Sequence, residues 1–396
     1  MELKLDAAKW RKRRGTSRLL KALAAEQGLT RYVGGAVRDD LLDLPVSDID
    51  LATRLQPDEV IDRLQKARIK AVPTGIDHGT VTAVSDGHPF EITTLRRDVS
   101  TDGRRAVVAY TDDWKEDAAR RDFTINALSA DPVSGEIFDY FGGLDDLQTR
   151  HIRFIGEPLQ RIAEDHLRIL RFFRFHARFG GGEPDAPALE ACSQRANDLM
   201  ALSRERVADE LLKLLAVADP SPTVAIMLDR EILKPVLPEI GREGLEALKP
   251  LVAAERQAGI EPDPLRRLAA LLPTDPDTAD EIGVRLRLSN KARKRLVCDA
   301  AASVRESPQA LAYRVGTECA VDRLLLSGRP EDAKSIAAWK APRLPISGGA
   351  LIARGLAEGP IVAKTLKAIE DQWLKGGFPT GEEFERIVSG ALARAR

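Results

Sequence analysis

The stretch YVGGAVRDDLLDLPVSDIDLAT, residues 32–53, contains a double glycine followed by two aspartates that one residue separates. The apolar run before the glycines and the AVRDDLL run after them predict a strand, a glycine turn and a helix. Backbone N–H groups at such a turn can approach a phosphate closely, and an arginine one turn later offers a forked guanidinium to the same oxygens. We therefore predict that Gly34, Gly35 and Arg38 bind a triphosphate.

The two aspartates, Asp48 and Asp50, lie in SDIDLAT, where polar and apolar residues alternate as they do in a strand. Residues two apart in a strand point to the same side, so both carboxylates are expected on one face. Paired oxygen ligands suit Mg²⁺, which completes its coordination shell with water and substrate phosphate. We predict both aspartates as metal ligands and catalytic residues. A D-x-D pattern alone is usually a turn, and the neighbouring glycine turn favours the catalytic interpretation.

Two later segments add candidates to the same site. Glu91, in PFEITTL, is an acid within an apolar strand-like run, and it is either a third catalytic carboxylate or a solvated strand position. In RRDFTINAL, residues 120–128, Arg121 suits a triphosphate contact. Asp122 and Asn126 suit the hydroxyls of a ribose, although each of these polar residues alone would be read as a helix cap or a surface pair.

Composition limits the class of protein. The chain has 396 residues, which is more than one ordinary hydrophobic core accommodates, so we expect two or more domains. Of its residues 31% are charged and the net charge is -1, so the surface is not basic overall. Any contact with nucleic acid must come from local basic clusters. Two such clusters are KWRKRR at residues 9–14 and RLRLSNKARKR at 285–295, and each can equally be a solvated helix face.

The chain shows no signal segment and no apolar run of the roughly 20 residues that would cross a membrane. Its three cysteines, Cys192, Cys298 and Cys319, have no CxxC spacing. They argue against a disulfide framework and against a zinc site, and they suit a reducing compartment. We expect a cytoplasmic protein.

Residues 1–30 read as a basic amphipathic helix ending near Gly28. From there to about residue 140, short strand-like runs alternate with turns and include one helical pattern. Beyond Gly143 the patterns are helical, with proline-rich joints. The predicted fold class is α+β, with a small mixed sheet at the start and an all-helical remainder.

Three motifs, GGAVRD…DID, RRDFTINAL and EDHLRILRFFRF, occur here in the order found in class II tRNA nucleotidyltransferases, the CCA-adding enzymes, and in bacterial poly(A) polymerases. The chain resembles this family from residue 32 to 215, and more loosely at LPISGGALIARGLAEGP, residues 344–360. The resemblance implies a catalytic nucleotidyltransferase head at 1–145, a nucleotide-reading neck at 146–215, and a tRNA-binding body and tail at 216–396.

The activity that this resemblance implies is template-independent addition of C, C and A to the 3′ end of tRNA. The enzyme would use CTP, ATP and Mg²⁺ and would release pyrophosphate; no protein partner is evident. Three rivals stay open: a poly(A) polymerase, an enzyme that adds only CC or only A, and a catalytically silent RNA-binding protein. The presence of both aspartates, Arg38 and Arg121 speaks against the silent protein.

The segment EDHLRILRFFRF, residues 164–175, offers a physical means of selecting bases without a template. Side chains three apart in a helix lie near one face, and this spacing relates Asp165, Arg168, Arg171 and Arg174. An acid and an arginine together can read the Watson–Crick edge of a base. The resemblance assigns base selection to Asp165 and Arg168, and nucleotide contact to Arg171 and Arg174; a solvated basic face is the alternative.

Two further segments have expected roles. Residues 96–119, RRDVSTDGRRAVVAYTDDWKEDAA, read as a mobile loop of the kind that CCA-adding members carry and A-only members tend to lack. In LSRERVADELLKLL, the Arg204, Glu205 and Arg206 group is expected to brace the nucleotide-reading helix through an ion pair.

Overall fold

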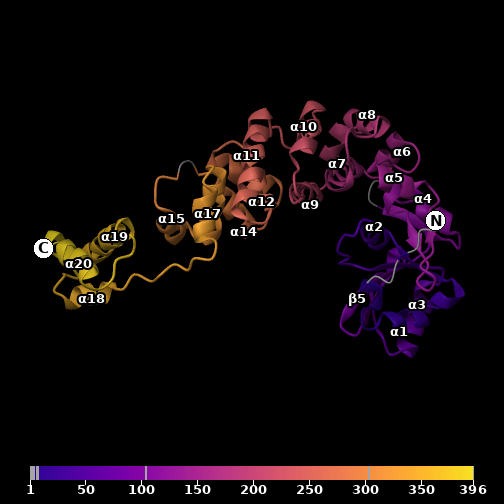
Figure 1. The fold of residues 1–396 in the computed structure, drawn as a ribbon, viewed down its shortest axis with the longest axis horizontal. Helices are drawn as coiled ribbons and strands as arrows, with labels where there is room; N and C mark the ends of the chain where they lie inside the picture. Colours follow the sequence, from indigo (N-terminus) through magenta and orange to yellow (C-terminus); the bar gives the residue numbers. More distant parts are fainter. Residues whose placement is uncertain (1–4, 6–8, 103–104, 302–303, 396) are drawn as a thin grey trace. The chain divides into compact units, whose positions relative to one another are not determined.

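The computed structural model describes residues 5, 9–102, 105–301 and 304–395. The chain forms two compact units (Figure 1): Met1–Leu214 with Asp229–Val236, and Leu215–Leu228 with Leu237–Arg396. Every strand of the described residues lies in the first unit, and the second unit is helical. The predicted α+β class, with a small sheet followed by helices, is therefore confirmed.

The first unit is built on a seven-stranded sheet in the order β3-β4-β5-β2-β1-β8-β9. The pairing of β2 with β5 is parallel and the other pairings are antiparallel, so the sheet is mixed, as predicted. Burial alternates along β4 because successive side chains of a strand point to opposite faces. The strands are β1 (Thr30–Val33), β2 (Asp50–Thr53), β3 (Lys70–Gly75), β4 (Thr80–Ser85), β5 (His88–Thr94), β8 (Ser129–Ala130) and β9 (Ile137–Phe138).

Short helices complete the first unit. In α3, Pro57 occupies the first position, two acids follow in the first turn, and Val60 and Leu64 are buried on one face, as expected for an amphipathic helix. The α-helices are α1 (Thr16–Ala22), α2 (Gly35–Leu41), α3 (Pro57–Lys66), α4 (Trp114–Ala119), α5 (Gly143–Thr149), α6 (Pro158–Glu164), α7 (Arg168–Phe179), α8 (Ala186–Gln194) and α9 (Arg204–Leu215). The 3₁₀ turns are η1 (Lys9–Lys12), η2 (Ala25–Gln27), η3 (Ile76–His78), η4 (Thr124–Asn126) and η5 (Ala196–Ala201).

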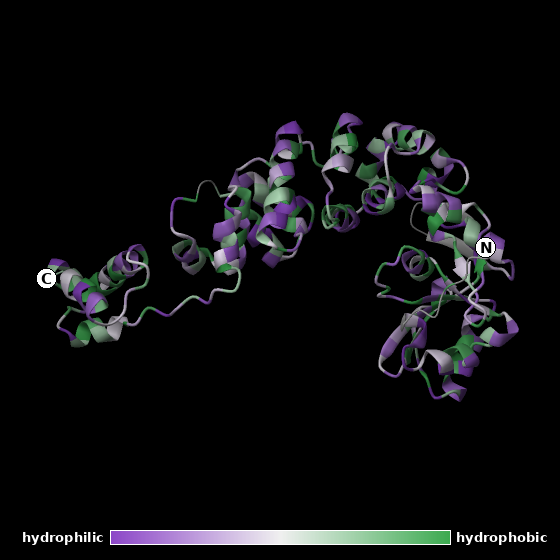
Figure 2. Cartoon of the chain, in the orientation of Figure 1, coloured by the Kyte–Doolittle hydropathy of each residue, from purple (hydrophilic) through white to green (hydrophobic). Residues whose placement is uncertain are grey.

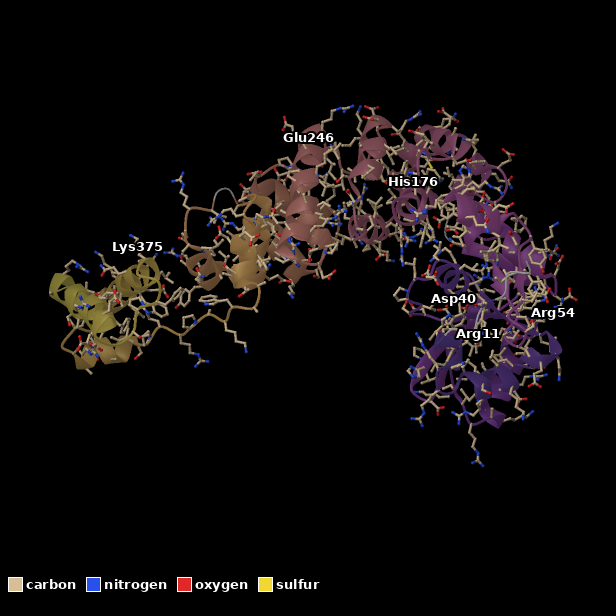
Figure 3. The ribbon with its side chains drawn as sticks, in the orientation of Figure 1. Arg11, Asp40, Arg54, His176, Glu246 and Lys375 are labelled. Atoms are coloured by element: carbon tan, nitrogen blue, oxygen red, sulfur yellow. A yellow bond between two sulfur atoms is a disulfide. The ribbon has the colours of Figure 1, made fainter. Side chains whose placement is uncertain are left out.

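The prediction of one basic helix over residues 1–30 is wrong for the described part of that segment, which forms η1, α1 and η2. The chain turns at Gly15, where φ is 83° and an added Cβ would lie 2.4 Å from the Oγ of Ser85. A φ of 83° lies outside the right-handed helical region, so a continuous helix cannot pass through Gly15. The close approach to Ser85 leaves room only for glycine. Arg11, labelled in Figure 3, donates to the carbonyls of Leu5 and Pro132 and ties this segment to the sheet unit.

The segment predicted as a mobile loop is largely regular. Residues Arg96–Asp102 and Arg105–Tyr110 form strands β6 and β7 of a two-stranded antiparallel sheet, and α4 follows. The β-type run AVVAY supplies the second strand, and the charges around it led to the loop prediction. The Asp-Gly turn falls at Gly103, which lies outside the described residues.

The segment predicted as one nucleotide-reading helix is two helices. α6 ends at Glu164 and α7 begins at Arg168. Asp165 between them is extended, with φ −154° and ψ 108°, and its Oδ1 accepts the backbone N–H of Leu167. A short acid that bonds its own backbone competes with helix formation, which explains the break. Asp165 therefore does not lie on the same helix as the three arginines.

Among the described residues, helices of the second unit share at least two hydrophobic cores. One joins α11, α12, α15, α16 and α17 around residues such as Leu324, and the other joins α18, α19 and α20 around Trp373. Purple and green residues alternate along these helices in Figure 2, as expected where helices bury one face. None of the described helices has the length and apolar character needed to cross a bilayer. The helices are α10 (Ser221–Asp229), α11 (Arg242–Ala258), α12 (Pro264–Leu271), α13 (Pro276–Arg285), α14 (Asn290–Asp299), α15 (Pro308–Val315), α16 (Thr317–Leu326), α17 (Pro330–Ile336), α18 (Gly348–Ala353), α19 (Pro360–Lys375) and α20 (Gly381–Ala395).

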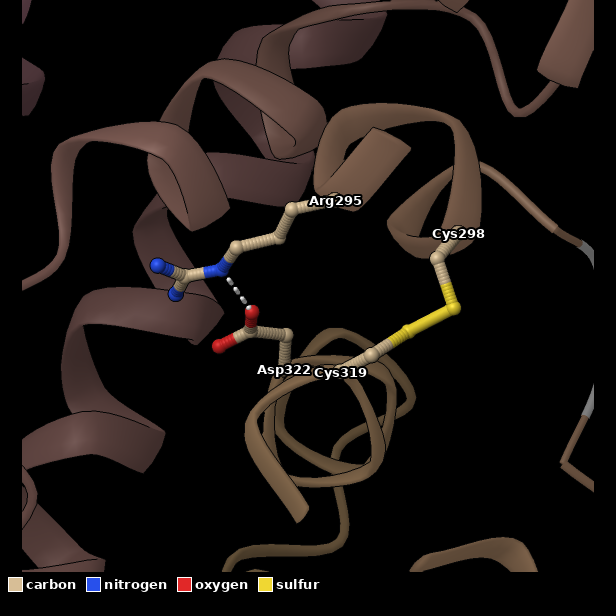
Figure 4. The surroundings of a disulfide bond; sticks show 4 residues. All are labelled: Arg295, Cys298, Cys319 and Asp322. Atoms are coloured by element: carbon tan, nitrogen blue, oxygen red, sulfur yellow. Dashed lines mark hydrogen bonds and ion pairs between the residues drawn. A yellow bond between two sulfur atoms is a disulfide. The ribbon is translucent and has the colours of Figure 1, made fainter. Parts of the chain in front are cut away.

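A disulfide joins Cys298 of α14 to Cys319 of α16 (Figure 4), so the expectation that the cysteines form no disulfide is wrong. The two residues are 21 apart in sequence, and packing of their helices brings them together. Arg295 and Asp322, from the same two helices, form an ion pair beside the bond, with a distance of 2.6 Å between Nε and Oδ2. Cys192 is free and buried.

Asp299, the last residue of α14, is a buried acid. It is 5% exposed, and neither carboxyl oxygen has a hydrogen-bond partner within the described part of the chain. Burial, followed by the negative charge of Asp322, raises the pKa of Asp299 to about 9. The folded protein therefore keeps a proton that the unfolded chain releases near pH 4, so this group lowers stability as pH rises from about 4 to 9.

We expect Asp299→Asn to stabilise the protein increasingly as pH rises, because the amide does not titrate. The difference in unfolding free energy between variant and wild type should grow by at least about 1 kcal/mol from pH 5 to pH 8, since one pKa unit corresponds to about 1.4 kcal/mol. Urea unfolding at both pH values measures it, with the exposed Asp277 as the control for Asp→Asn substitution. The same difference at both pH values would contradict this account.

Candidate active site

The glycine turn lies directly after β1. Gly34 has φ 66° and ψ −123°, and α2 begins at Gly35. Glycine is required here by the positive φ, and the missing side chain also leaves room for Arg121, whose Nη1 would lie 2.8 Å from an added Cβ. The predicted strand, glycine turn and helix are therefore confirmed, and the turn lies against one of the predicted phosphate contacts.

Arg38 in α2 and Asn126 in η4 are in direct contact. Arg38 is 6% exposed, donates to the Oδ1 of Asn126 and forms an ion pair with Asp39 at 2.6 Å. Its guanidinium also lies over the ring of Phe179, with 4.1 Å between its Cζ and the ring centroid. Burial lowers the pKa of Arg38 from its usual value, and Asp39 opposes that change. These contacts hold the guanidinium in one orientation.

Asp122 links the RRDFTINAL segment to α7. Its Oδ2 accepts from Nε and Nη2 of Arg171 at 2.7 and 2.5 Å, and its Oδ1 accepts from Asn126 and from the backbone of Phe123. Burial would raise the pKa of this carboxyl, but Arg171 and these hydrogen bonds hold it below its usual value. Asp122 is therefore a buried anion that orients Asn126 and Arg171.

Asp165 and Arg168 lie at the junction of α6 and α7. The Oδ2 of Asp165 accepts from Nη2 of Arg206 at 2.7 Å, so the LSRERV segment makes an ion pair with the extended residue before α7 and not with the helix itself. Arg168 donates to the carboxylate of Glu164 and, at 2.8 Å, to the carbonyl of Arg161. Both side chains are therefore held by neighbours and present fixed polar groups.

One cavity of about 400 Å³ collects most of the predicted nucleotide-binding residues. Its lining consists of Gly34, Gly35, Arg38, Arg121, Asp122, Asn126, Asp165, Arg168, Arg171 and Phe175. Arg174 is the predicted residue that this cavity leaves out, because its guanidinium pairs with Glu210 at 2.7 Å and stacks on Phe175. A larger cavity of about 590 Å³ in the second unit contains no predicted site residue.

Three carboxylates gather at the start of β2. The parallel register places Asp50 opposite Glu91 of β5, and Asp48 precedes Asp50 by two residues. β2 begins only at Asp50, so the prediction that both aspartates lie on one strand is wrong: Asp48 lies in the loop before it. The pairings of β2 with β5 and β1 begin at Asp50 and Leu51, so Asp48 lies before the paired part of the chain.

The electrostatics of this group fit a divalent cation. Burial, and then the negative charges of Glu91 and Asp48, raise the pKa of Asp50 to about 6, while Arg121 lowers it. A cation bound here would relieve this repulsion. Within the described residues, no group of three or more His, Cys, Asp or Glu side chains is gathered closely enough to bind a metal alone. Two carboxylates can still hold Mg²⁺ when phosphate oxygens and water complete its shell.

Sequence reasoning missed Phe175, Glu164 and Glu210. Phe175 lines the cavity, Glu164 accepts from Arg161 and Arg168, and Glu210, 4% exposed, accepts from Arg174. Each is an acid or aromatic residue within a motif whose arginines were recognised. Buried arginines need acidic or aromatic partners. An acid or aromatic residue within an arginine-rich motif could therefore have been predicted as such a partner.

The two basic clusters mostly make internal contacts. In residues 9–14, Arg11 and Arg13 donate to backbone carbonyls. In residues 285–295, Arg285, Arg293 and Arg295 pair with acids. These contacts favour structural roles over phosphate binding for those five arginines.

Comparison with known proteins gives the family. Residues 30–153 match the poly A polymerase head domain, and residues 184–242 match the probable RNA and SrmB-binding site of polymerase A. The chain is 34% identical over 383 residues to human CCA tRNA nucleotidyltransferase 1, mitochondrial, covering 92% of this chain and 87% of the relative. The chain belongs to the family of CCA-adding enzymes and poly(A) polymerases. It is therefore a nucleotidyltransferase, of a family that uses a divalent metal.

A further relative supports the same placement, and two solved structures share the fold. The CCA-adding enzyme of Limosilactobacillus fermentum is 32% identical over 393 residues, covering 93% of this chain and 95% of that enzyme. The fold matches a Thermotoga maritima CCA-adding enzyme complexed with tRNA, with a TM-score of 0.71, 22% identity and full coverage of both chains. It also matches the Bacillus stearothermophilus enzyme in complex with CTP, with a TM-score of 0.69, 24% identity, and coverage of 96% and 98%.

Proposed function

We propose that this chain adds C, C and A to the 3′ end of tRNA, using CTP, ATP and Mg²⁺ and releasing pyrophosphate. One observation carries the proposal: a single cavity joins the glycine turn and Arg38 to Asp165 and Arg168, and its Arg121 also acts on the Asp50 carboxyl. A site of this kind can hold a triphosphate, read a base and present its α-phosphate to carboxylate-held metal. The relatives named as CCA-adding enzymes, which match more than nine-tenths of the chain, support this reaction over the rivals.

The triphosphate is bound by the glycine turn, Arg38 and Arg121. Gly34 and Gly35 let the oxygens approach the backbone, and the two guanidiniums neutralise their charge. Asp122 and Asn126 orient Arg38 and Arg171, and they contact the ribose where their polar atoms face the cavity. Binding the phosphates in one orientation aligns the α-phosphate with the RNA 3′-hydroxyl.

Asp48 and Asp50 hold Mg²⁺, and Glu91 adds negative charge beside them. When bound, Mg²⁺ activates the attacking hydroxyl and stabilises the leaving pyrophosphate. The carboxyl of Asp50, with a pKa of about 6, is mostly ionised at neutral pH and is available as a ligand.

Base selection comes from Asp165 and Arg168. The carboxylate of Asp165 accepts from an exocyclic amine of C or A, and Arg168 donates to a ring acceptor. Arg206 and Glu164 hold these two side chains, which fixes the pattern that an incoming base must match. Arg171 lies at the cavity beside them, and Arg174 acts on nucleotide only through Glu210 and Phe175.

Residues 1–145 form the catalytic head in this proposal, 146–215 the nucleotide-reading neck, and 216–396 the body and tail that bind tRNA. We infer a cytoplasmic site of action, where tRNA and both nucleotides are present together. The human and mouse relatives are named as mitochondrial, so fractionation with a compartment marker is the test.

Labelled nucleotide incorporation tests the proposal. A tRNA transcript that ends before CCA should accept CMP from CTP with Mg²⁺, and the reaction should stop with EDTA. UTP and GTP should give no product, and a tRNA that already ends in CCA should accept nothing. Incorporation of AMP alone would favour a poly(A) or A-only enzyme, and no incorporation would favour the silent RNA-binding protein.

A further inference from the structure

The loop between α2 and β2, residues 42–49, carries Asp48 outside regular structure. Within the described residues, its recorded backbone–backbone hydrogen bonds end at Leu44, whose N–H donates to the carbonyl of Asp39. None joins Val46, Ser47 or Asp48 to a helix or a strand. The position of Asp48 is therefore set by side-chain contacts.

Burial of Ile49, which is 2% exposed, fixes the chain on one side of Asp48, and Arg13 makes the hydrogen bonds on the other side. Its Nη1 donates to the carbonyl of Ser47 at 2.9 Å, and its Nη2 donates to the carbonyl of Val46 at 2.7 Å. The hydroxyl of Ser47 in turn donates to Oδ2 of Asp48 at 2.9 Å. A planar guanidinium that binds two successive carbonyls fixes the direction of the chain between them. One arginine thereby orients the peptide that leads into Asp48.

The segment that carries Arg13 is itself held on the first unit. Trp10 is 7% exposed, its Nε1 donates to Oδ1 of Asp40 at 2.6 Å, and its ring meets the ring of Tyr32 edge-on at 4.8 Å. Tyr32 belongs to β1 and Asp40 to α2, so this one turn contacts elements on either side of the glycine turn. Figure 3 labels Arg11, from the same turn as Trp10, and Asp40, from α2. The segment that carries Arg13 is therefore held in place on the first unit.

We propose that Arg13 is a positioning residue that holds the 42–49 loop so that Asp48 lies beside Asp50 for a divalent cation. This role rests on the proposed function, and it gives the basic KWRKRR segment a use other than RNA contact. Without the two hydrogen bonds, cation binding must also order the loop, and the entropy of that ordering weakens binding. The charge of Arg13 acts in the opposite direction, because a cation repels a cation.

Mn²⁺ binding to the full-length protein, followed by electron paramagnetic resonance without nucleotide, tests the proposal. Arg13→Ala should raise the Mn²⁺ dissociation constant roughly tenfold, as expected for the loss of two charge-assisted hydrogen bonds. Loss of positive charge alone would tighten cation binding, so the direction separates positioning from charge. Arg13→Lys, which keeps the charge and can donate to one carbonyl, should lie between. Arg18→Ala, at an exposed pair with Asp86, should match wild type.

The concentration of Mg²⁺ that gives half-maximal CMP addition should rise by a similar factor in Arg13→Ala, with the rate at saturating Mg²⁺ nearly unchanged. Unchanged or tighter Mn²⁺ binding in Arg13→Ala overturns the proposal, as does a wild-type protein that binds no Mn²⁺. If Arg13→Ala does not fold, the Mn²⁺ dissociation constant of Arg13→Lys is compared with that of wild type instead, and it should still be raised. Weakened Mn²⁺ binding in a protein that adds no nucleotide would uphold the positioning role and refute the proposed function alone.

Discussion

Asp50→Asn is expected to lower the rate of nucleotide addition by at least about a thousandfold, because metal-assisted phosphoryl chemistry loses a ligand. Asp50 is the half-buried carboxyl at the start of β2, opposite Glu91 and beside Asp48. Asparagine keeps its shape and removes its charge. Burial, and then the charges of Glu91 and Asp48, raise the pKa of Asp50 to about 6, and this unfavourable burial of a charge disappears in the variant. Thermal stability should therefore be equal or higher, and tRNA affinity should be unchanged. Single-turnover CMP addition measures the rate.

Two further substitutions make this result specific. Asp58→Asn removes an exposed acid from the first turn of α3 and should leave the rate within about twofold of wild type. Glu91→Gln distinguishes the two interpretations of that residue: a rate loss of about tenfold or more indicates a third catalytic carboxylate, and no loss indicates a solvated strand position. Wild-type rates in both Asp48→Asn and Asp50→Asn would refute the metal assignment.

Arg168→Ala is expected to impair nucleotide choice more than RNA binding. The preference for CTP and ATP over UTP and GTP, measured as a ratio of kcat/KM values, should fall about 10- to 100-fold, as expected for the loss of one base-reading side chain. Affinity for tRNA should change less than about threefold, because Arg168 is proposed to contact the base of the incoming nucleotide, whereas tRNA affinity depends mainly on phosphate contacts. Competition between labelled nucleotides in one reaction gives the ratio.

Arg168 also binds Glu164 and the carbonyl of Arg161, so its loss could loosen the junction of α6 and α7. Arg168→Lys keeps a donor for these partners and separates the two effects, since a lysine cannot present the same fork to a base. Arg178→Ala removes an exposed arginine from the same helix, and it should leave selectivity intact. Unchanged selectivity in Arg168→Ala would refute the base-reading role.

Local patterns predicted much of the first unit. The apolar run ending at Val33, the double glycine and the AVRDDLL run form the strand, turn and helix that their propensities favour. Glu91 and Asp50 were each placed in strands from their own neighbours. Their adjacency depends on the parallel pairing of β2 with β5, which is a tertiary contact that no local pattern contains.

The errors have definite causes. Asp165 carries a side chain that bonds the backbone of Leu167, and this local bond ends a helix that apolar spacing alone continues. Gly15 adopts φ 83° against Ser85, a neighbour from β4. Cys298 and Cys319 meet because α14 packs on α16. In the last two cases the deciding partner is distant in sequence, so spacing could not predict it.

The most direct measurement is the 3′-terminal sequence of tRNA after reaction with CTP and ATP together in Mg²⁺. Transcripts ending before CCA, after C and after CC should all finish at CCA and extend no further. Long A tails would contradict the account in favour of a poly(A) polymerase, and arrest after CC or extension only from CC would show an enzyme with part of the activity. If no transcript is extended, the proposal that this site adds nucleotides to tRNA is refuted.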